Sequence, residues 1–161
     1  MDDAAARTTP PAHDLAASPR LFRNPILDKL SRVHHWTPAI IYLPIVAVLL
    51  GFSATRLKFS ILIAGIIGGY LAWTLFEYFT HKKIFHFVPP GALGARLHFL
   101  IHGVHHDYPN DPLRLVMPPL VSVPVVVAVF LVLRLVCGAN LALPVTAGFL
   151  VGYVAYDMLH F

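Results

Sequence analysis

Residues 77–119 read EYFTHKKIFHFVPPGALGARLHFLIHGVHHDYPNDPLRLVMPP, and long apolar runs lie on both sides of this stretch. It contains six of the ten histidines of the 161-residue chain: His81, His86, His98, His102, His105 and His106. Two patterns stand out, HxxxxH from His81 to His86 and HxxHH from His102 to His106. Because imidazole is a common ligand for iron, zinc and copper, the stretch predicts a metal site between the apolar runs.

The composition of the whole chain is that of a membrane protein. Hydrophobic residues make up 57% of it and charged residues 12%, whereas soluble domains carry roughly 25% charged residues. Mean hydropathy is +0.70. A single cysteine, Cys137, excludes an intrachain disulfide and a cysteine-based zinc site. The net charge of +4 could indicate nucleic acid as a partner, but the basic residues lie at the borders of apolar runs. That placement favours orientation in a bilayer and no nucleic acid partner.

Four apolar runs predict an all-α membrane protein with about four transmembrane helices, at residues 38–52, 59–79, 120–136 and 141–156. The first run is short for a bilayer, which needs about 20 residues, and Pro124 interrupts the third. Two of the runs carry the GxxxG spacing that lets helices pack closely, at Gly65 and Gly69 and at Gly148 and Gly152. We therefore expect a packing role for these glycines.

The residues before the first run divide into two parts. Residues 1–20 are rich in Ala, Pro, Thr and Asp and lack the apolar core of a secretory signal, which predicts a disordered tail. Residues 21–36 mix aromatic, aliphatic and basic side chains. They predict a short amphipathic segment at the level of the lipid headgroups, with Trp36 as an interface anchor. We expect residues 21–161 to form one membrane domain.

Four crossings place both ends of the chain and the loop 80–116 on the same side of the membrane. Nine basic residues lie on that side: Arg7, Arg20, Arg23, Lys29, Arg32, Lys82, Lys83, Arg96 and Arg114. Three lie on the other side: Arg56, Lys58 and Arg134. By the positive-inside rule, the histidine clusters of this multi-pass protein are expected to face the cytoplasm.

Helical geometry relates the histidines of the second cluster. Residues 95–106 contain no proline and read as a helix broken only near Gly103, with its histidines along one face. His102 and His106 lie one turn apart and can bind a single metal. His105 is rotated about 100° from His106 and can point to a neighbouring metal.

The first cluster has a different spacing. An offset of five residues is not a same-face pair on an α-helix, so His81 and His86 are not expected to meet by helical periodicity alone. His86 is expected where the helix unwinds before Pro89 and Pro90.

Four carboxylates lie near the histidines: Glu77, Asp107, Asp111 and Asp157. A carboxylate that accepts the second ring N–H of a ligating histidine fixes its tautomer and raises its basicity. For Asp107 and Asp111, ordinary solvated loop charges are an equal alternative. His98 lies outside the HxxHH core, where an outer or packing role is expected. For the clusters as a whole, the alternatives are a structural metal site or a proton relay.

Three segments resemble a known family in order and spacing: WTLFEYFTHKKIFHFVPP, LHFLIHGVHHDYPNDPLRLVMPP and GYVAYDMLH. The family is the membrane-bound fatty acid 2-hydroxylases, within the wider fatty acid hydroxylase superfamily, and the resemblance extends from about residue 21 to the end. The superfamily shares HxxxxH and HxxHH. The EYxxH motif, the HG before the HH pair and RLVxPP are similar to the 2-hydroxylase branch rather than to sterol desaturases or carotenoid hydroxylases.

The resemblance implies a helical membrane enzyme that uses dioxygen to hydroxylate C2 of a long-chain fatty acid, free or within a ceramide. It implies two metal ions, with iron expected for catalysis and zinc possible in purified protein. His81, His86, His102 and His106 are implied as ligands of one metal, and His105 and His160 as ligands of the other. Electrons are implied to come from an external donor such as cytochrome b5 or ferredoxin.

The family pattern continues beyond YDxxH to further histidines, whereas this sequence stops at Phe161. We therefore expect a chain truncated within the pattern, with the second metal short of ligands. Two alternative functions stay open at this point. One is a sterol or other lipid desaturase or hydroxylase of the same superfamily, and the other is a non-catalytic membrane metal-binding protein.

Overall fold

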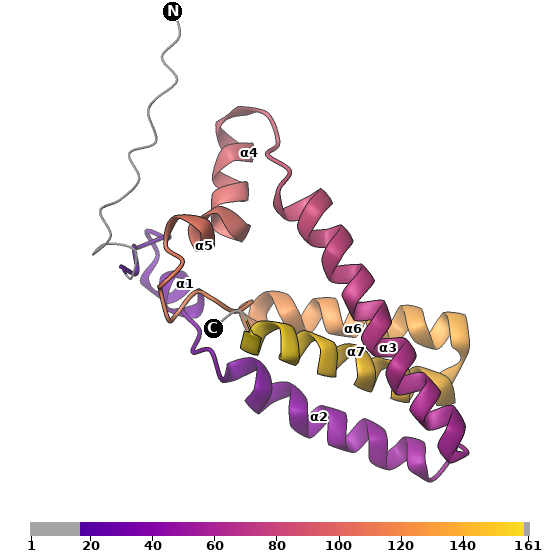
Figure 1. Cartoon of the computed structure of the whole chain (residues 1–161). Helices are drawn as coiled ribbons and strands as arrows, with labels where there is room; N and C mark the ends of the chain where they lie inside the picture. The colour runs from indigo at the N-terminus through magenta and orange to yellow at the C-terminus, as the bar shows by residue number, and fades with distance from the viewer. Residues whose placement is uncertain (1–16, 160–161) are drawn as a thin grey trace, which may run out of the picture.

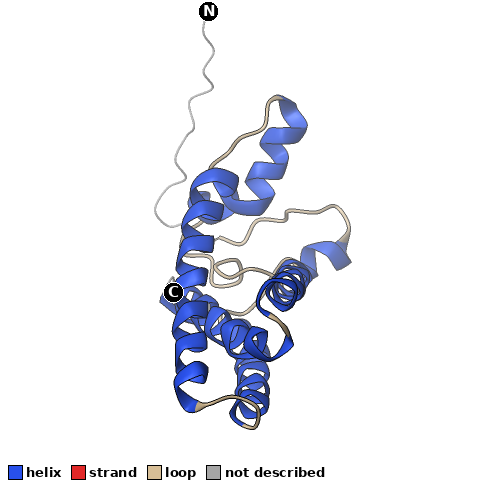
Figure 2. Ribbon diagram, turned by 90° about the vertical axis from the view of Figure 1, so that its right-hand side faces the viewer, coloured by secondary structure: helices blue, strands red, loops and turns tan. Residues whose placement is uncertain are grey.

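The computed structural model describes residues 17–159, and every regular element in that range is helical, as Figure 1 and Figure 2 show. Most of the predicted tail and His160 lie outside the described residues. The long helices are α2 (Thr37–Ala54), α3 (Phe59–Thr80), α6 (Pro119–Cys137) and α7 (Ala139–Leu159). The short elements are α1 (Pro25–Leu30), α4 (Gly91–His98), α5 (Val104–Asp107) and the π-helical segments η2 (His81–Phe85) and η3 (Phe99–Gly103).

The four long helices are each long and apolar enough to cross a bilayer, which confirms the predicted all-α membrane fold. α2 begins at Thr37, one residue before the predicted run, so Pro38 lies in its first turn. Proline is tolerated there because the backbone N–H groups of the first turn have no partner within the helix. Its 18 residues rise about 27 Å, close to the roughly 30 Å of a hydrocarbon core. The predicted interruption at Pro124 is wrong, since α6 continues through this residue. Transmembrane helices tolerate the loss of one backbone hydrogen bond.

α7 is the central helix of the bundle. Within its apolar window 61% of the residues are buried, against 6% for α6. Trp73 of α3 packs against Phe149 and Tyr153 of α7, and Tyr153 also contacts Tyr42 of α2. Figure 1 shows α3 crossing α6 and α7 partway along its length and then extending away from them towards α4. The histidine segments that follow α3 therefore lie at the end of the bundle.

Glycines allow α3 and α7 to touch backbone to backbone. A Cβ atom on Gly69 would collide with the carbonyl oxygen of Val145, and one on Gly148 would collide with that of Ile66. A Cβ on Gly65 would lie 2.8 Å from the Pro144 ring. The predicted packing role of these glycines is confirmed, and the close approach fixes where α3 crosses α7.

α1 and the residues around it pack on the loop that follows α5. The backbone N–H of Val33 donates to the carbonyl oxygen of Leu113 at 2.7 Å. Asn24 caps α1 by accepting from the N–H of Ile26 at 2.9 Å. Asp28 is buried whereas Ile26 is exposed, so α1 turns its acid towards the protein and apolar side chains outwards. This arrangement fits the predicted position at the lipid headgroups.

Candidate metal centre

The first histidine pair lies where α3 widens into η2. The backbone N–H of His86 donates to the carbonyl oxygen of His81 at 3.2 Å, an i to i+5 bond. In such a π-helical turn residues five apart return to nearly the same side, and the two ring centroids are 4.9 Å apart. The expectation that this spacing does not form a same-face pair is wrong, because it assumed α-helical geometry. His86 ends the helical segment before Pro89, as predicted.

The second cluster lies on a continuous helical segment formed by α4, η3 and α5. The predicted break near Gly103 is wrong, because the chain there widens into a π-helical turn rather than unwinding. His102 and His106 remain one turn apart, with their Nε2 atoms 2.9 Å from each other. His102 is buried and His106 is exposed. The pair therefore points one ring inwards and leaves the other at the surface.

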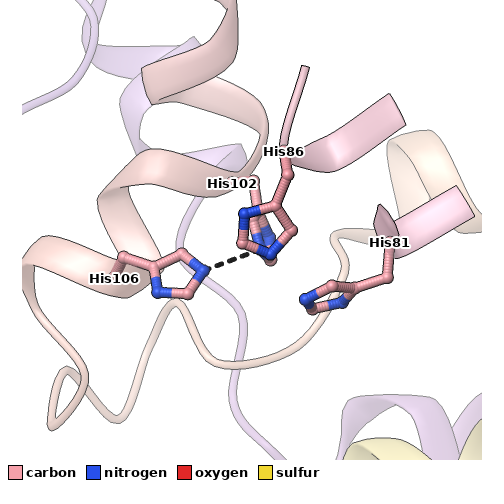
Figure 3. A group of neighbouring side chains, drawn as sticks. All are labelled: His81, His86, His102 and His106. Carbon is pink, nitrogen blue, oxygen red and sulfur yellow. Dashed lines mark hydrogen bonds between the residues drawn. The ribbon is translucent and has the colours of Figure 1, made fainter. Parts of the chain in front are cut away.

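Four histidines from these two segments converge, as Figure 3 shows. One ring nitrogen from each lies within 4.8 Å of the others in the set His81, His86, His102 and His106. Nitrogen ligands bind zinc at about 2.0–2.1 Å, so ligands of one ion lie roughly 3–4 Å apart. The spacing and the all-imidazole donor set fit a single metal ion such as zinc or iron.

Burial and neighbouring rings keep the second pair of imidazoles neutral. Burial, followed by the rings of His106 and His81, lowers the pKa of His102 to about 3. The pKa of His106 is also lowered, first by the partial desolvation of this otherwise exposed ring and then by the ring of His86. A histidine ligates a metal only as the neutral ring. His102 and His106 therefore present lone pairs rather than positive charges near neutral pH.

Glu77 orients the His81 ring. Its Oε1 lies 3.3 Å from Nδ1 of His81, and the Glu77 side chain is only 12% exposed. The Tyr156 hydroxyl lies 3.5 Å from the same nitrogen. When Nδ1 donates to the carboxylate, Nε2 carries the lone pair that a metal needs. The contact expected from the spacing of Glu77 and His81 is present.

The other predicted site residues lie outside this set of four. His105 has its ring centroid 6.1 Å from that of His102. His98 is half-buried at the end of α4, and Asp107 is exposed at the end of α5. Asp157 is buried on α7. Since His160 lies outside the described residues, its role as a ligand of the second metal stays a prediction.

Asp111 stabilises the loop after α5. Its side chain is fully buried, so the solvated alternative for this residue is wrong. Its Oδ1 accepts from the backbone N–H of Leu113 at 3.0 Å. Its Oδ2 lies 3.9 Å from Nε of Arg114. The Asp111 carboxylate thus stabilises the turn between α5 and α6.

A cavity of about 300 Å³ lies next to the histidines. His81, His102 and His105 line it together with the polar groups of Glu77, Asp157 and Arg114. α1, the loop before α6 and the first turn of α6 supply mostly apolar side chains to the remaining wall. The candidate metal centre therefore opens onto a mainly apolar space at the end of the membrane bundle.

Comparisons with known proteins identify the family of this chain. The family model described as fatty acid hydroxylase matches residues 66–161. The chain belongs to the fatty acid hydroxylase family. The matched range includes the second half of α3, both histidine patterns, α6 and α7, so this fatty acid hydroxylase family member carries its candidate metal centre within the shared region.

The relatives of this fatty acid hydroxylase family member include lipid 2-hydroxylases. The chain is 35% identical to a dihydroceramide fatty acyl 2-hydroxylase of Arabidopsis thaliana, over 89% of this chain and 61% of that protein. It is 35% identical to a fatty acid 2-hydroxylase of Rattus norvegicus, over 92% of this chain and 46% of that protein. The chain spans about half the length of the curated relatives it matches.

A solved structure supports the fold. The structure of full-length scs7p, of which only the hydroxylase domain is visible, is similar to this chain with a TM-score of 0.79 at 33% identity. The similarity covers 84% of this chain and 52% of that one. The helical arrangement over most of this chain is therefore similar to that of the scs7p hydroxylase domain.

Sequence reasoning missed two residues near the cavity, Asp28 and Arg114. The sequence presents Arg114 only as a positive loop charge, and no spacing pattern marks Asp28. Both are buried, and Arg114 lines the cavity. The available signal was a basic residue within the short apolar segment before Pro118 and Pro119, but spacing along the chain does not reveal its partner on α1.

Proposed function

We propose that this fatty acid hydroxylase family member hydroxylates long-chain fatty acyl groups at C2, using dioxygen and a histidine-bound dimetal centre. The observation that carries the proposal is the four-imidazole cluster beside a mainly apolar cavity, at the end of a bundle of four membrane-crossing helices. The names of the relatives support it, since they describe 2-hydroxylases of fatty acids and of dihydroceramide acyl chains.

In this proposal His81, His86, His102 and His106 hold one metal, and His105 and His160 belong to the second. Iron is the working metal, and zinc also fits an all-histidine site. When bound, the metals supply the activation of dioxygen. The position of His105 supports its separate assignment, because it borders the cavity without joining the set of four.

The chain itself supplies orientation and exclusion of water. Glu77 holds Nδ1 of His81 and directs the opposite ring nitrogen away from the carboxylate. The cavity encloses the acyl end of the substrate between the histidines and α1, and its apolar wall keeps water from the reacting carbon. The remainder of the acyl chain extends between helices towards the lipid.

The substrate and the electron donor come from outside the chain. A long acyl chain, free or within a ceramide, enters from the bilayer in which the long helices lie. An external donor such as cytochrome b5 or ferredoxin delivers electrons at the end of the bundle that carries the histidine clusters. We place this end on the cytoplasmic side. The excess of basic residues on that side supports this orientation.

Lipid product analysis tests the proposal. The full-length reading frame that contains these residues is expressed in a host that lacks 2-hydroxy fatty acids, beside a His102→Ala variant and a His34→Ala control. His34 is an exposed histidine outside the metal cluster. We expect 2-hydroxylated acyl chains from the wild type and the control, and none from His102→Ala.

Two other outcomes would reject the proposal. A new double bond in the lipids instead of a hydroxyl group would indicate a desaturase. Bound metal without any change in the lipids, from a well-folded wild type supplied with an electron donor, would indicate a non-catalytic metal-binding protein.

A further inference from the structure

Arg114 is a buried cation with unused hydrogen-bond donors. The residue is 7% exposed, and none of its three guanidinium nitrogens has a hydrogen-bond partner among the described residues 17–159. A guanidinium carries five N–H donors in a planar fork. Because a buried donor without an acceptor is costly, this side chain is suited to an acceptor supplied by a ligand.

Two aspartates balance the charge of Arg114 without occupying its donors. Nη2 lies 3.5 Å from Oδ1 of Asp28, and Nε lies 3.9 Å from Oδ2 of Asp111. Both distances exceed the roughly 2.7–3.2 Å of an N–H···O hydrogen bond. Oδ1 of Asp28 already accepts from the backbone N–H of Leu21 at 2.7 Å. The aspartates therefore hold the cation in place while its N–H groups stay available.

The position of Arg114 is linked to the second histidine cluster. Its backbone N–H donates to the carbonyl oxygen of Asp111, and the N–H of Asp111 donates to that of Tyr108. The N–H of Tyr108 donates to the carbonyl oxygen of Val104 in α5. Arg114 and His105 line the same cavity, whose other walls are mostly apolar. A lipid whose apolar chain fills this cavity has its polar end near the N–H groups of the Arg114 guanidinium.

We propose that Arg114 is a positioning residue that holds the acyl carbonyl oxygen of the substrate. The oxygen belongs either to the carboxylate of a free fatty acid or to the carbonyl of an amide-linked chain, since both accept from a guanidinium. The inference rests on the proposed function. A carbonyl held at one point restricts which carbon lies beside the histidines, so this contact contributes to the choice of C2.

Quenching of Trp73 fluorescence by ligands bound in the cavity tests the inference without any turnover. The chain has two tryptophans, and Trp73 lines the cavity, so a Trp36→Phe background leaves Trp73 as the sole reporter. Three probes carry the same acyl chain with bromine atoms that quench tryptophan fluorescence. They are a fatty acid, its N-alkyl amide and an alkyl ether that lacks the carbonyl oxygen.

In the Trp36→Phe background, the acid, the amide or both are expected to bind about tenfold or more tightly than the ether, as a hydrogen bond to a charged group predicts. The preferred probe identifies the source of the oxygen. A charge-balanced Arg114→Gln/Asp111→Asn variant is expected to bind all three probes with the affinity of the ether. Arg114→Lys, which keeps the charge but loses the fork, is expected to lose most of the preference for the amide.

Arg32→Gln is the matched control, since Arg32 also pairs with Asp28, at 3.2 Å, but does not line the cavity. This variant is expected to keep the preference for the carbonyl. Equal binding of the three probes in the Trp36→Phe background would overturn the role of Arg114 and leave the proposed function untouched. An unchanged preference for the carbonyl-bearing probes in both Arg114 variants would have the same consequence. Failure of all three probes to quench Trp73 would count against the proposed function itself.

Discussion

α3 and α7 meet backbone to backbone inside the bundle, whereas the two histidine pairs meet side chain to side chain at its end. The first contact is built from glycines that leave no room for a Cβ atom. The second lies in residues 81–107, here called the histidine hairpin, where Leu93 and Ile101 are 72% and 62% exposed. We expect packing to hold the bundle together and a bound metal to contribute to the stability of the histidine hairpin.

Replacement of Gly69 by alanine is expected to have the largest effect on this contrast. The new Cβ would meet backbone atoms of Val145 and Phe149 that cannot move aside easily, so we expect a loss of about 3 kcal/mol in the free energy of unfolding. Gly68→Ala is the control, because nothing lies within 4 Å of its Cβ. Unfolding titrations in detergent measure both variants, and equal stability would contradict the backbone contact.

His102→Ala is expected to affect the histidine hairpin without affecting the bundle. The variant removes the most buried histidine of the cluster, so metal content should fall to that of chelator-treated protein while the bundle keeps its resistance to denaturant. Metal analysis and helical circular dichroism of the same sample provide the measurement. Parallel loss of metal and of the bundle would show that the regions do not fold independently.

Glu77→Gln should weaken metal binding without abolishing it. The amide no longer stabilises the required Nδ1–H tautomer of His81 as the carboxylate does, and the loss of such a partner typically costs about 10–100-fold in metal affinity. Asp107→Asn is the matched control, since Asp107 is an exposed carboxylate beside His106. Competition with a chelator measures both constants. An equal effect in the two variants would rule out a specific role for Glu77.

His98→Ala is expected to have the smallest effect. His98 lies on the same helical segment but outside the set of four, so metal affinity should change by less than in Glu77→Gln. The same chelator competition provides the measurement. A loss of bound metal comparable to that of His102→Ala would show that His98 is a ligand and that the cluster extends towards α4.

The sequence allowed the membrane part of the fold to be predicted closely. Apolar runs and glycine spacing are local patterns, and a bilayer requires helices wherever it meets a long apolar run. Errors occurred where a local rule was applied without its surroundings, as with Pro124, around which α6 continues. The candidate site was predicted less completely, because the widened turns η2 and η3 have no sequence signature that helical periodicity could detect.

By itself, the sequence determined four membrane-crossing helices, the close contact of the glycine-bearing runs and the two histidine patterns between them. Only the tertiary structure decided which charges are buried, and it showed how the four histidines that the family resemblance implied for one metal come together. The π-helical turn brings His81 and His86 to one side, and the docking of α1 buries Asp28 beside Arg114. Both outcomes depend on how distant segments pack, and spacing along one chain segment carries no information about the partner that another segment provides.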